Sequence, residues 1–390
     1  MKNESKQVRA GVQTLTGLLI VLCILCVSAA SQNSLPISTN PPIKRLVGDY
    51  GYWSKYQTPA YGAAQIPFSK VTHIIHFGVS FGSDGGLAVP DGFLEPELIQ
   101  QAHAAGVKVL VGLGGNFSEF DGNRRLMGQL ASNLWAFISQ NEYDGVDIDW
   151  EYPVAQEAKT FYGLMAALRA VLPGPNYLIS ADVPPWGGDG YALRRVEPLL
   201  DFFNIMMYDC AGPWTQDGQL NSEIFWDASN PDPWECQPGG SAEDAIRIFT
   251  IDNGVAPFKL NMGTPFYGYL YYTVSQLWQE CSNASHTKDG NCDNAVVSVN
   301  YGTFIKQRIN KKRWQTFYDP IALVPYMLRT NGHAGFITYD DAFSTYSRVW
   351  YADWQKNLGG TFMWSLDADY DGQSQDLLDA MYSATLGPAR

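Results

Sequence analysis

The sequence predicts an α/β protein, a (β/α)8 TIM barrel with a small α+β insertion before the last strand. Eight short apolar runs alternate with stretches of helical periodicity, and strands that alternate with helices form parallel sheets. The chain has 390 residues, which is long for one domain but within the range of a single barrel. A doubly wound sheet is the alternative, but it usually carries a Gly-rich fingerprint after its first strand, and residues 112–115 (GLGG) do not match that fingerprint.

The expected elements follow one another in a regular order from residue 45 to residue 390, the range assigned to the catalytic barrel. Helical periodicity is clearest at residues 95–106, 124–143 and 157–172. An inserted α+β subdomain is expected at 270–340, because a connection this long without secondary structure would be unusual. The eight expected strands lie at 45–53, 71–81, 107–115, 144–152, 177–184, 202–209, 258–268 and 359–366.

The N-terminus has the features of a secretory signal peptide, which we assign to residues 1–30. Basic residues precede an apolar run at 15–27, and small residues at 28–30 offer a cleavage site. An uncleaved anchor is the alternative, but the run is short for a bilayer span of roughly 20 residues. A polar, Pro-rich linker follows at 31–44. We therefore expect a secreted, extracellular protein with no membrane association after cleavage.

Four cysteines remain after the signal peptide, and an even number in a secreted chain indicates two disulfides. Of the three possible pairings, the one that joins Cys281 to Cys292 is favoured because it closes a polar loop. That choice leaves Cys210 to pair with Cys236. Metal binding is the weaker interpretation, since no CxxC or HxxxH pattern accompanies these cysteines.

Composition restricts the class of partner. The net charge of −13 argues against nucleic acid and anionic membranes as partners. Most of the 12 Trp and 22 Tyr residues belong to the core, yet such a number of Trp also suits a protein that stacks on sugar rings. We expect a monomer with no cofactor and no metal ion.

The strand at 144–152, DGVDIDWEY, combines strand-forming residues with four carboxylates. Alternation along a strand places Asp147, Asp149 and Glu151 on one face, toward the barrel interior. Glu151 lies at the C-terminal end of the strand, where barrel enzymes place their chemistry. Like charges in a buried line raise one another's pKa, as a general acid requires. A metal site or a structural row of acids is the alternative, but no histidine clusters with these acids in the sequence, and Asp144 is expected to serve as a turn or cap.

The segment DGVDIDWEYP resembles, without a mismatch, the signature of the glycoside hydrolase family 18 chitinases. The resemblance extends from about residue 45 to residue 385 and implies a barrel enzyme that hydrolyses chitin, a polymer of N-acetylglucosamine. The further segments that resemble family motifs are MMYDCAGPW (206–214), KLNMGTPFYG (259–268), ITYDD (337–341) and GGTFMWSLDAD (359–369).

The resemblance implies a role for each catalytic residue. Glu151 would protonate the glycosidic oxygen and then activate water. The family uses no carboxylate nucleophile, because the N-acetyl oxygen of the substrate attacks the anomeric carbon. Asp149 would orient the acetamido N–H and offset the charge of the oxazolinium ion, and Asp147 would share a proton with Asp149. Tyr208 would donate to the acetamido oxygen.

Seven further residues are expected to bind substrate. Trp364 would form the floor of the subsite in which the sugar ring is distorted. Asp209 would bind a sugar hydroxyl or lie beside Glu151. The full set is Tyr50, Trp53, Met206, Asp209, Trp214, Tyr267 and Trp364.

Two positions depart from the family pattern, which has an aromatic residue where Asp49 stands and a serine where Gly112 stands. In the family, Tyr and Ser hydroxyls support the innermost aspartate. One hypothesis is that a protonated Asp49 donates the missing hydrogen bond to Asp147. The alternative is a chitin-binding protein with reduced or no hydrolysis. A third possibility is an endo-β-N-acetylglucosaminidase that acts on N-glycans, although such enzymes usually lack the inserted subdomain.

Overall fold

The computed structural model describes residues 44–230, 240–281 and 292–386. The expected signal peptide, all of the expected linker except its last residue, and Cys236 lie outside these residues. No helix in the described part of the chain is long and apolar enough to cross a bilayer.

Eight parallel strands form a closed barrel, because the first strand pairs with both the second and the last. All eight expected barrel strands and the predicted fold class are confirmed. A short additional strand, β3 (Leu87–Ala88), pairs antiparallel with the end of β2. The barrel strands are β1 (Arg45–Gly51), β2 (His73–Phe81), β4 (Lys108–Gly114), β5 (Gly145–Asp149), β6 (Leu178–Val183), β7 (Phe202–Ile205), β8 (Leu260–Pro265) and β14 (Gly360–Trp364).

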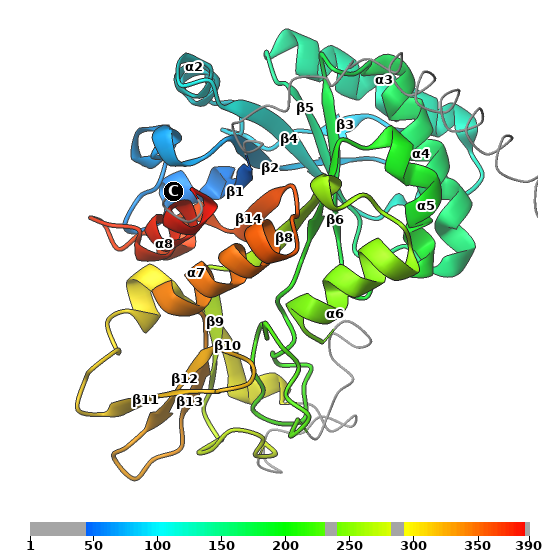
Figure 1. The fold of residues 1–390 in the computed structure, drawn as a ribbon. Coiled ribbons are helices and arrows are strands. Elements are labelled where there is room, and N and C mark those ends of the chain that lie inside the picture. Colours follow the sequence, from blue (N-terminus) through cyan, green and yellow to red (C-terminus); the bar gives the residue numbers. More distant parts are fainter. Residues whose placement is uncertain (1–43, 231–239, 282–291, 387–390) are drawn as a thin grey trace, which may run out of the picture. The chain divides into compact units, whose positions relative to one another are not determined.

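Helices lie along the outside of the strands, as Figure 1 shows most clearly for α3, α4 and α5. In α3 the side chain of Asn123 caps the first turn by accepting from the N–H of Leu126, and apolar residues at helical spacing are buried. The three helices expected from periodicity are present as α2, α3 and α4. The bounds are α2 (Pro96–Ala104), α3 (Arg124–Gln140), α4 (Ala158–Val171), α5 (Leu193–Val196), α6 (Ala242–Arg247), α7 (Ala342–Trp350) and α8 (Asp376–Thr385).

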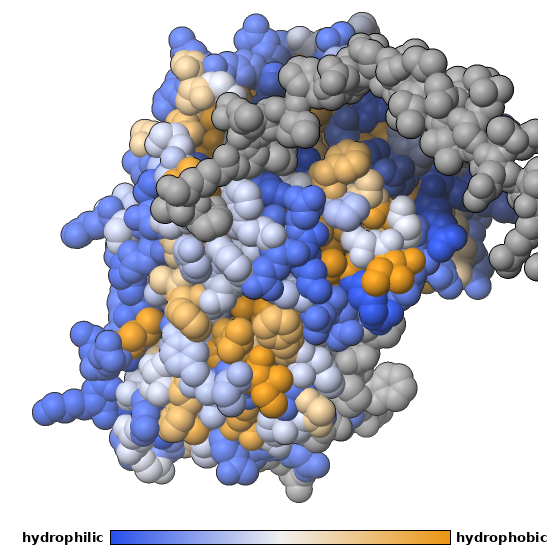
Figure 2. Space-filling view, viewed as in Figure 1, coloured by the Kyte–Doolittle hydropathy of each residue, from blue (hydrophilic) through white to orange (hydrophobic). Residues whose placement is uncertain are grey.

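The insertion between β8 and β14 is a five-stranded antiparallel sheet with the order β10-β9-β13-β12-β11. It begins at Tyr267, slightly before the expected boundary, and its described helical segments are single short turns such as η11 (Tyr301–Ile305). On the face shown in Figure 2, apolar residues gather over this sheet. The strands are β9 (Tyr267–Tyr271), β10 (Val296–Asn300), β11 (Trp314–Tyr318), β12 (Pro325–Arg329) and β13 (Phe336–Thr338).

The disulfides agree with the expected pairing where they are described. Cys281 and Cys292 are bonded, with their Cα atoms 5.7 Å apart, which confirms the predicted bridge. Cys210 is also disulfide-bonded. Its expected partner, Cys236, lies outside the described residues.

The side chains inside the barrel change from apolar to polar along the barrel axis. Val47, Ile75 and Leu110, on the inner faces of β1, β2 and β4, belong to one buried apolar cluster. Two residues further along β1 the inward position carries Asp49, and β5 contributes Asp147 at the same level. Side-chain alternation therefore places a polar layer between the apolar base of the barrel and its C-terminal opening.

Candidate active site

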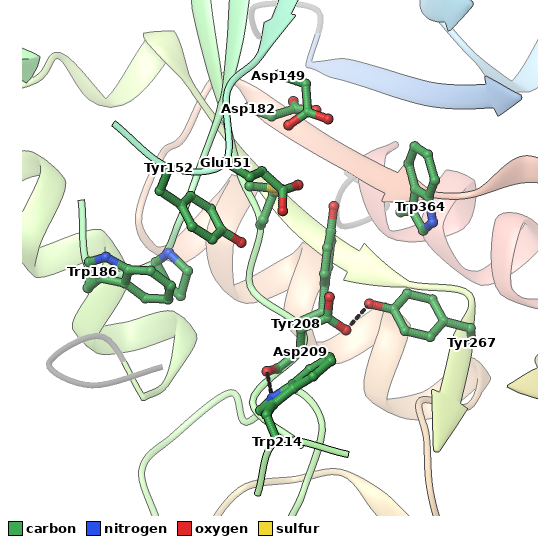
Figure 3. A pocket seen from close by; sticks show the side chains of 12 residues that line it. Asp149, Glu151, Tyr152, Asp182, Trp186, Tyr208, Asp209, Trp214, Tyr267 and Trp364 are labelled. Carbon is green, nitrogen blue, oxygen red and sulfur yellow. Dashed lines mark hydrogen bonds between the residues drawn. The ribbon is translucent and has the colours of Figure 1, made fainter. Parts of the chain in front are cut away.

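A cavity of about 550 Å³ lies at the C-terminal ends of the barrel strands (Figure 3). Its walls come from the segments that follow β5, β6 and β7, from the end of β14 and from the start of β9, because the carboxyl ends of parallel strands meet at one face of a barrel. Twelve residues line it: Asp149, Glu151, Tyr152, Asp182, Pro185, Trp186, Met206, Tyr208, Asp209, Trp214, Tyr267 and Trp364.

Asp149 and Glu151 form the acidic pair of the cavity. Both line the cavity at the end of β5 and lie two residues apart in the sequence. Burial first, and then the charges of Glu151 and Asp147, raise the pKa of Asp149 well above its usual range. Tyr152, the next residue along the chain, also lines the cavity (Figure 3). Two carboxyl groups therefore face the same cavity, and the surroundings of Asp149 favour its protonated form.

Asp147 lies behind Asp149, fully buried and outside the lining of the cavity. One of its oxygens accepts from Ser180 Oγ at 2.5 Å and from Asn204 Nδ2 at 3.3 Å. Burial raises the pKa of Asp147 to about 7, although the Ser180 hydrogen bond opposes this shift. The donors that support the innermost aspartate thus come from β6 and β7 in this chain.

The orientation of Asn204 is fixed by a chain of amides. Arg45 Nε donates to Asn261 Oδ1 at 2.9 Å, and Asn261 Nδ2 donates to Asn204 Oδ1 at 2.9 Å. Because a guanidinium group can only donate, each amide in turn must present its oxygen toward Arg45 and its nitrogen away from it. Asn204 therefore presents only an N–H donor to Asp147 and Asp182.

Asp49 points into the barrel as expected, but the hydrogen bond predicted for it is absent. Its side chain is completely buried, and neither carboxyl oxygen has a hydrogen-bond partner. Burial, followed by the charges of Asp147 and Asp149, raises the pKa of Asp49 well above its usual range. The missing serine has a steric explanation, since a Cβ at Gly112 would come within 2.8 Å of the Phe77 ring.

We expect replacement of Asp49 by Asn to change how stability depends on pH. In the folded protein the raised pKa keeps Asp49 protonated, whereas in the unfolded chain it ionises near pH 4. The folded state consequently loses stability as pH rises above about 4, by up to ~1.4 kcal/mol per pH unit. The introduced amide cannot ionise, so the free energy of unfolding of the Asp49→Asn variant should fall less steeply between pH 4 and pH 7.

Chemical denaturation at pH 4, 5.5 and 7 measures this difference. We compare how steeply the free energy of unfolding changes with pH, rather than its value at one pH. A buried amide without hydrogen-bond partners lowers stability at every pH, and this cost does not affect the slope. The exposed Asp91 provides the matched control, because Asp91→Asn makes the same chemical change at the surface. Parallel slopes for wild type and Asp49→Asn would show that Asp49 is ionised in the folded protein.

Asp182 was not predicted from the sequence. It lies on β6 directly opposite Asp149 on β5, lines the cavity, and accepts from Asn204 Nδ2 at 3.0 Å. The sequence did contain an indication of it. In the strand LISADV, Ser180 and Asp182 share one face, and the same alternation that identified the acids of β5 assigns both to the interior.

The expected substrate-binding residues divide into two groups. Met206, Asp209, Trp214, Tyr267 and Trp364 line the cavity, as does Tyr208 from the catalytic set. Asp209 accepts from the hydroxyl groups of Tyr267 and Tyr269, and its backbone oxygen accepts from Trp214 Nε1 at 3.2 Å. This side of the cavity is therefore held by hydrogen bonds among its own residues.

The prediction that Tyr50 binds substrate is wrong. Alternation along β1 turns Asp49 inward and Tyr50 outward, where it is fully buried, stacks on His76 and donates to Glu95. Trp53 does not line the cavity either, although it packs against Trp364 with ring centroids 6.5 Å apart. Trp53 is thus an exposed neighbour of a residue that lines the cavity.

A smaller cavity of about 210 Å³ shares Asp209, Tyr267 and Trp364 with the main one. It also includes Ser298 and Asn300 of β10, so the hollow continues toward the insertion sheet. At another wall of the main cavity, Tyr152 and Trp186 meet edge to face at 5.3 Å. In the described part of the chain, no group of three or more His, Cys, Asp or Glu side chains is arranged to hold a metal ion.

Comparison with known proteins identifies the family. The model of the glycosyl hydrolases family 18 matches residues 45–369, which is most of the chain. The chain belongs to this family. Its members act on glycosidic bonds, and the recognition made from the sequence motifs is confirmed.

The relatives share the barrel at moderate sequence identity. Chitinase A1 of Niallia circulans is 27% identical over 311 residues, covering 70% of this chain and 42% of the relative. Chitinase B of Serratia marcescens is 28% identical over 288 residues, covering 61% and 57%. The chain thus spans about half the length of these two curated relatives. The Group IV chitinase of Ostrinia furnacalis has the same fold, with a TM-score of 0.77 at 21% identity over 88% of this chain and all of the other.

Proposed function

We propose that this family 18 protein is a chitinase, which hydrolyses β-1,4 linkages between N-acetylglucosamine units with retention of configuration. The observation that carries the proposal is the pair of carboxyl groups, Asp149 and Glu151, that line the cavity at the opening of the barrel. A carboxylic acid at that place can protonate a glycosidic oxygen, and its carboxylate partner can balance the positive charge that develops on the sugar.

In the proposed first step Glu151 gives its proton to the glycosidic oxygen while the substrate's acetamido oxygen forms a bond to the anomeric carbon. The leaving sugar departs as an alcohol, and a cyclic oxazolinium ion remains. Asp149 accepts a hydrogen bond from the acetamido N–H, and Tyr208 donates one to the acetamido oxygen. Asp147 lies behind Asp149 on β5, and a second proton, shared by these two aspartates, moves toward Asp147 when Asp149 turns to the substrate.

In the proposed second step the Glu151 carboxylate takes a proton from water as that water attacks the anomeric carbon. The bond to the acetamido oxygen breaks, which restores the N-acetyl group and the protonated acid. The other two carboxyl groups that line the cavity are hydrogen-bonded within the protein, Asp209 by two tyrosine hydroxyls and Asp182, through one of its oxygens, by Asn204. This arrangement supports a reaction whose nucleophile belongs to the substrate.

The aromatic walls are proposed to bind the rest of the sugar chain. Trp364, Trp186 and Trp214 present flat apolar faces to the cavity, as pyranose rings require. The N-terminal sequence further supports secretion of the protein, so we propose that it acts outside the cell, as a monomer, on chitin or its oligosaccharides.

Turnover of soluble N-acetylglucosamine oligomers from pH 3 to pH 9 tests the proposal. We expect cleavage with an optimum on the acidic side, because Glu151 must be protonated in the first step. Retained binding without turnover at any pH would instead indicate a chitin-binding protein. A parallel assay on a high-mannose glycoprotein separates the third possibility, since an endo-β-N-acetylglucosaminidase would release the glycan and leave the oligomers uncut.

A further inference from the structure

A further carboxyl group occupies the part of the cavity that lies between Asp149 and Tyr208. Asp182 is the register partner of Asp149 across β5 and β6. Both line the cavity together with Met206 and Tyr208, which follow β7 (Figure 3). Under the proposed function, Asp149 and Tyr208 hold the N-acyl group of the substrate. Asp182 is therefore within the compartment that receives that group.

The Asp182 carboxyl group is held in one orientation. Its Oδ1 accepts from Asn204 Nδ2 at 3.0 Å. The amide chain that runs from Arg45 through Asn261 prevents Asn204 from turning its oxygen toward the acids. The second carboxyl oxygen is consequently the one available to a ligand in the cavity that Asp182 lines.

The groups around Asp182 disfavour its ionised form. The ionisable side chains whose charges act on the pKa of Asp182 are Asp147, Asp49 and Asp149. The charge of Asp182 in turn acts on the pKa of Tyr208. Burial, and then these three acids, raise the pKa of Asp182 well above its usual range. A protonated carboxyl group both donates and accepts a hydrogen bond, so the compartment contains a neutral polar group with both capacities.

We propose that Asp182 is a substrate-contacting residue that selects the N-acyl group, because its carboxyl group offers a hydrogen bond to a hydroxyl on the α-carbon of that group. This inference rests on the proposed function, since it uses the same compartment. The substrate class it assigns comprises β-linked glucosamine chains that carry N-acetyl or hydroxylated N-acyl groups, of which N-glycolyl is the simplest. Larger apolar acyl groups would leave the polar group unpaired, which disfavours them.

Comparison of two acyl groups of nearly equal size separates the effect of hydrogen bonding from the effect of how well the group fits the cavity. N-glycolyl and N-propionyl differ only by a hydroxyl in place of a methyl group. The experiment measures kcat/KM on chitobiose aryl glycosides with N-acetyl, N-glycolyl or N-propionyl on the sugar that is attacked. We expect wild type to prefer the glycolyl over the propionyl substrate by about tenfold or more.

Substitutions assign that preference to Asp182. Asp182→Leu, which has the same branching but is apolar and larger, should lower the ratio of glycolyl to propionyl activity to about one or below. Asp182→Asn retains hydrogen-bonding capacity, so this variant should keep most of the preference for the glycolyl over the propionyl substrate. Asp91→Asn, the same change on an exposed aspartate outside the cavity, should leave it unchanged.

The outcomes distinguish this inference from the proposed function. Failure of wild type to cleave the N-acetyl substrate would overturn the proposed function. Cleavage of that substrate with a glycolyl-to-propionyl ratio near one would overturn only the role of Asp182, and so would an unchanged ratio in a folded Asp182→Leu protein. The wild-type ratio needs no variant, so it decides the matter even where Asp182→Leu does not fold.

Discussion

Replacement of Glu151 by Gln should lower kcat on chitin oligomers by about 10³-fold or more, within the range by which general acid–base catalysis accelerates a reaction. Gln has nearly the same shape, but it cannot donate the proton that the glycosidic oxygen needs, nor remove one from water. The loss should be smaller on an aryl glycoside, whose leaving group requires less protonation.

Binding separates this chemical defect from a structural one. Because Trp186, Trp214 and Trp364 line the cavity, tryptophan fluorescence reports oligosaccharide binding, and the Glu151→Gln variant should bind within a few-fold of wild type. Glu97→Gln is the matched control, since this glutamate is exposed on α2 and distant from the lining residues. Activity of Glu151→Gln within tenfold of wild type would remove Glu151 from the mechanism.

Replacement of Asp149 by Asn should reduce kcat by about 10²- to 10³-fold, a loss typical of removing one preorganised electrostatic group. The carboxylate is proposed to accept the acetamido N–H and to face the positive oxazolinium ion, and a neutral amide does neither equally well. The substitution should also change the pH profile of kcat, because the charge of Asp149 no longer acts on Glu151.

The pH profile distinguishes a catalytic Asp149 from one that only supports the fold. A structural defect would lower activity at every pH by the same factor and would lower the melting temperature. A profile parallel to that of wild type, with kcat reduced less than tenfold, would contradict the proposed role. Asp91→Asn serves again as the control for the chemical change alone.

Much of this fold was predictable because short stretches of the sequence determine where its strands and helices lie. Strands such as 107–115 are apolar runs bounded by Gly, and helices such as α3 carry both a cap and an apolar stripe. Alternation within one strand likewise placed Asp147 and Asp149 on the inner face. The insertion was foreseen only from the length of the connection, and its strand-rich character depends on long-range pairing that no local pattern specifies.

The site was harder to predict where several strands meet. Asp182 and Asn204 become part of it only because β6 and β7 follow β5 in the barrel. The expected hydrogen bond from Asp49 to Asp147 is absent, and the donors to Asp147 come instead from Ser180 and Asn204 on these two neighbouring strands. Tyr50 was assigned to the substrate although Asp49, its neighbour on β1, was expected to face inward, and one strand cannot turn both residues the same way.

The most direct test of the proposed mechanism is the anomeric configuration of the first product. Proton NMR of N-acetylglucosamine oligomers during the first minutes of hydrolysis distinguishes the new reducing end before the anomers equilibrate. Attack by the substrate's own acetamido group, followed by water, predicts the β-anomer as the initial product. Initial release of the α-anomer would show direct displacement by water and would contradict the account.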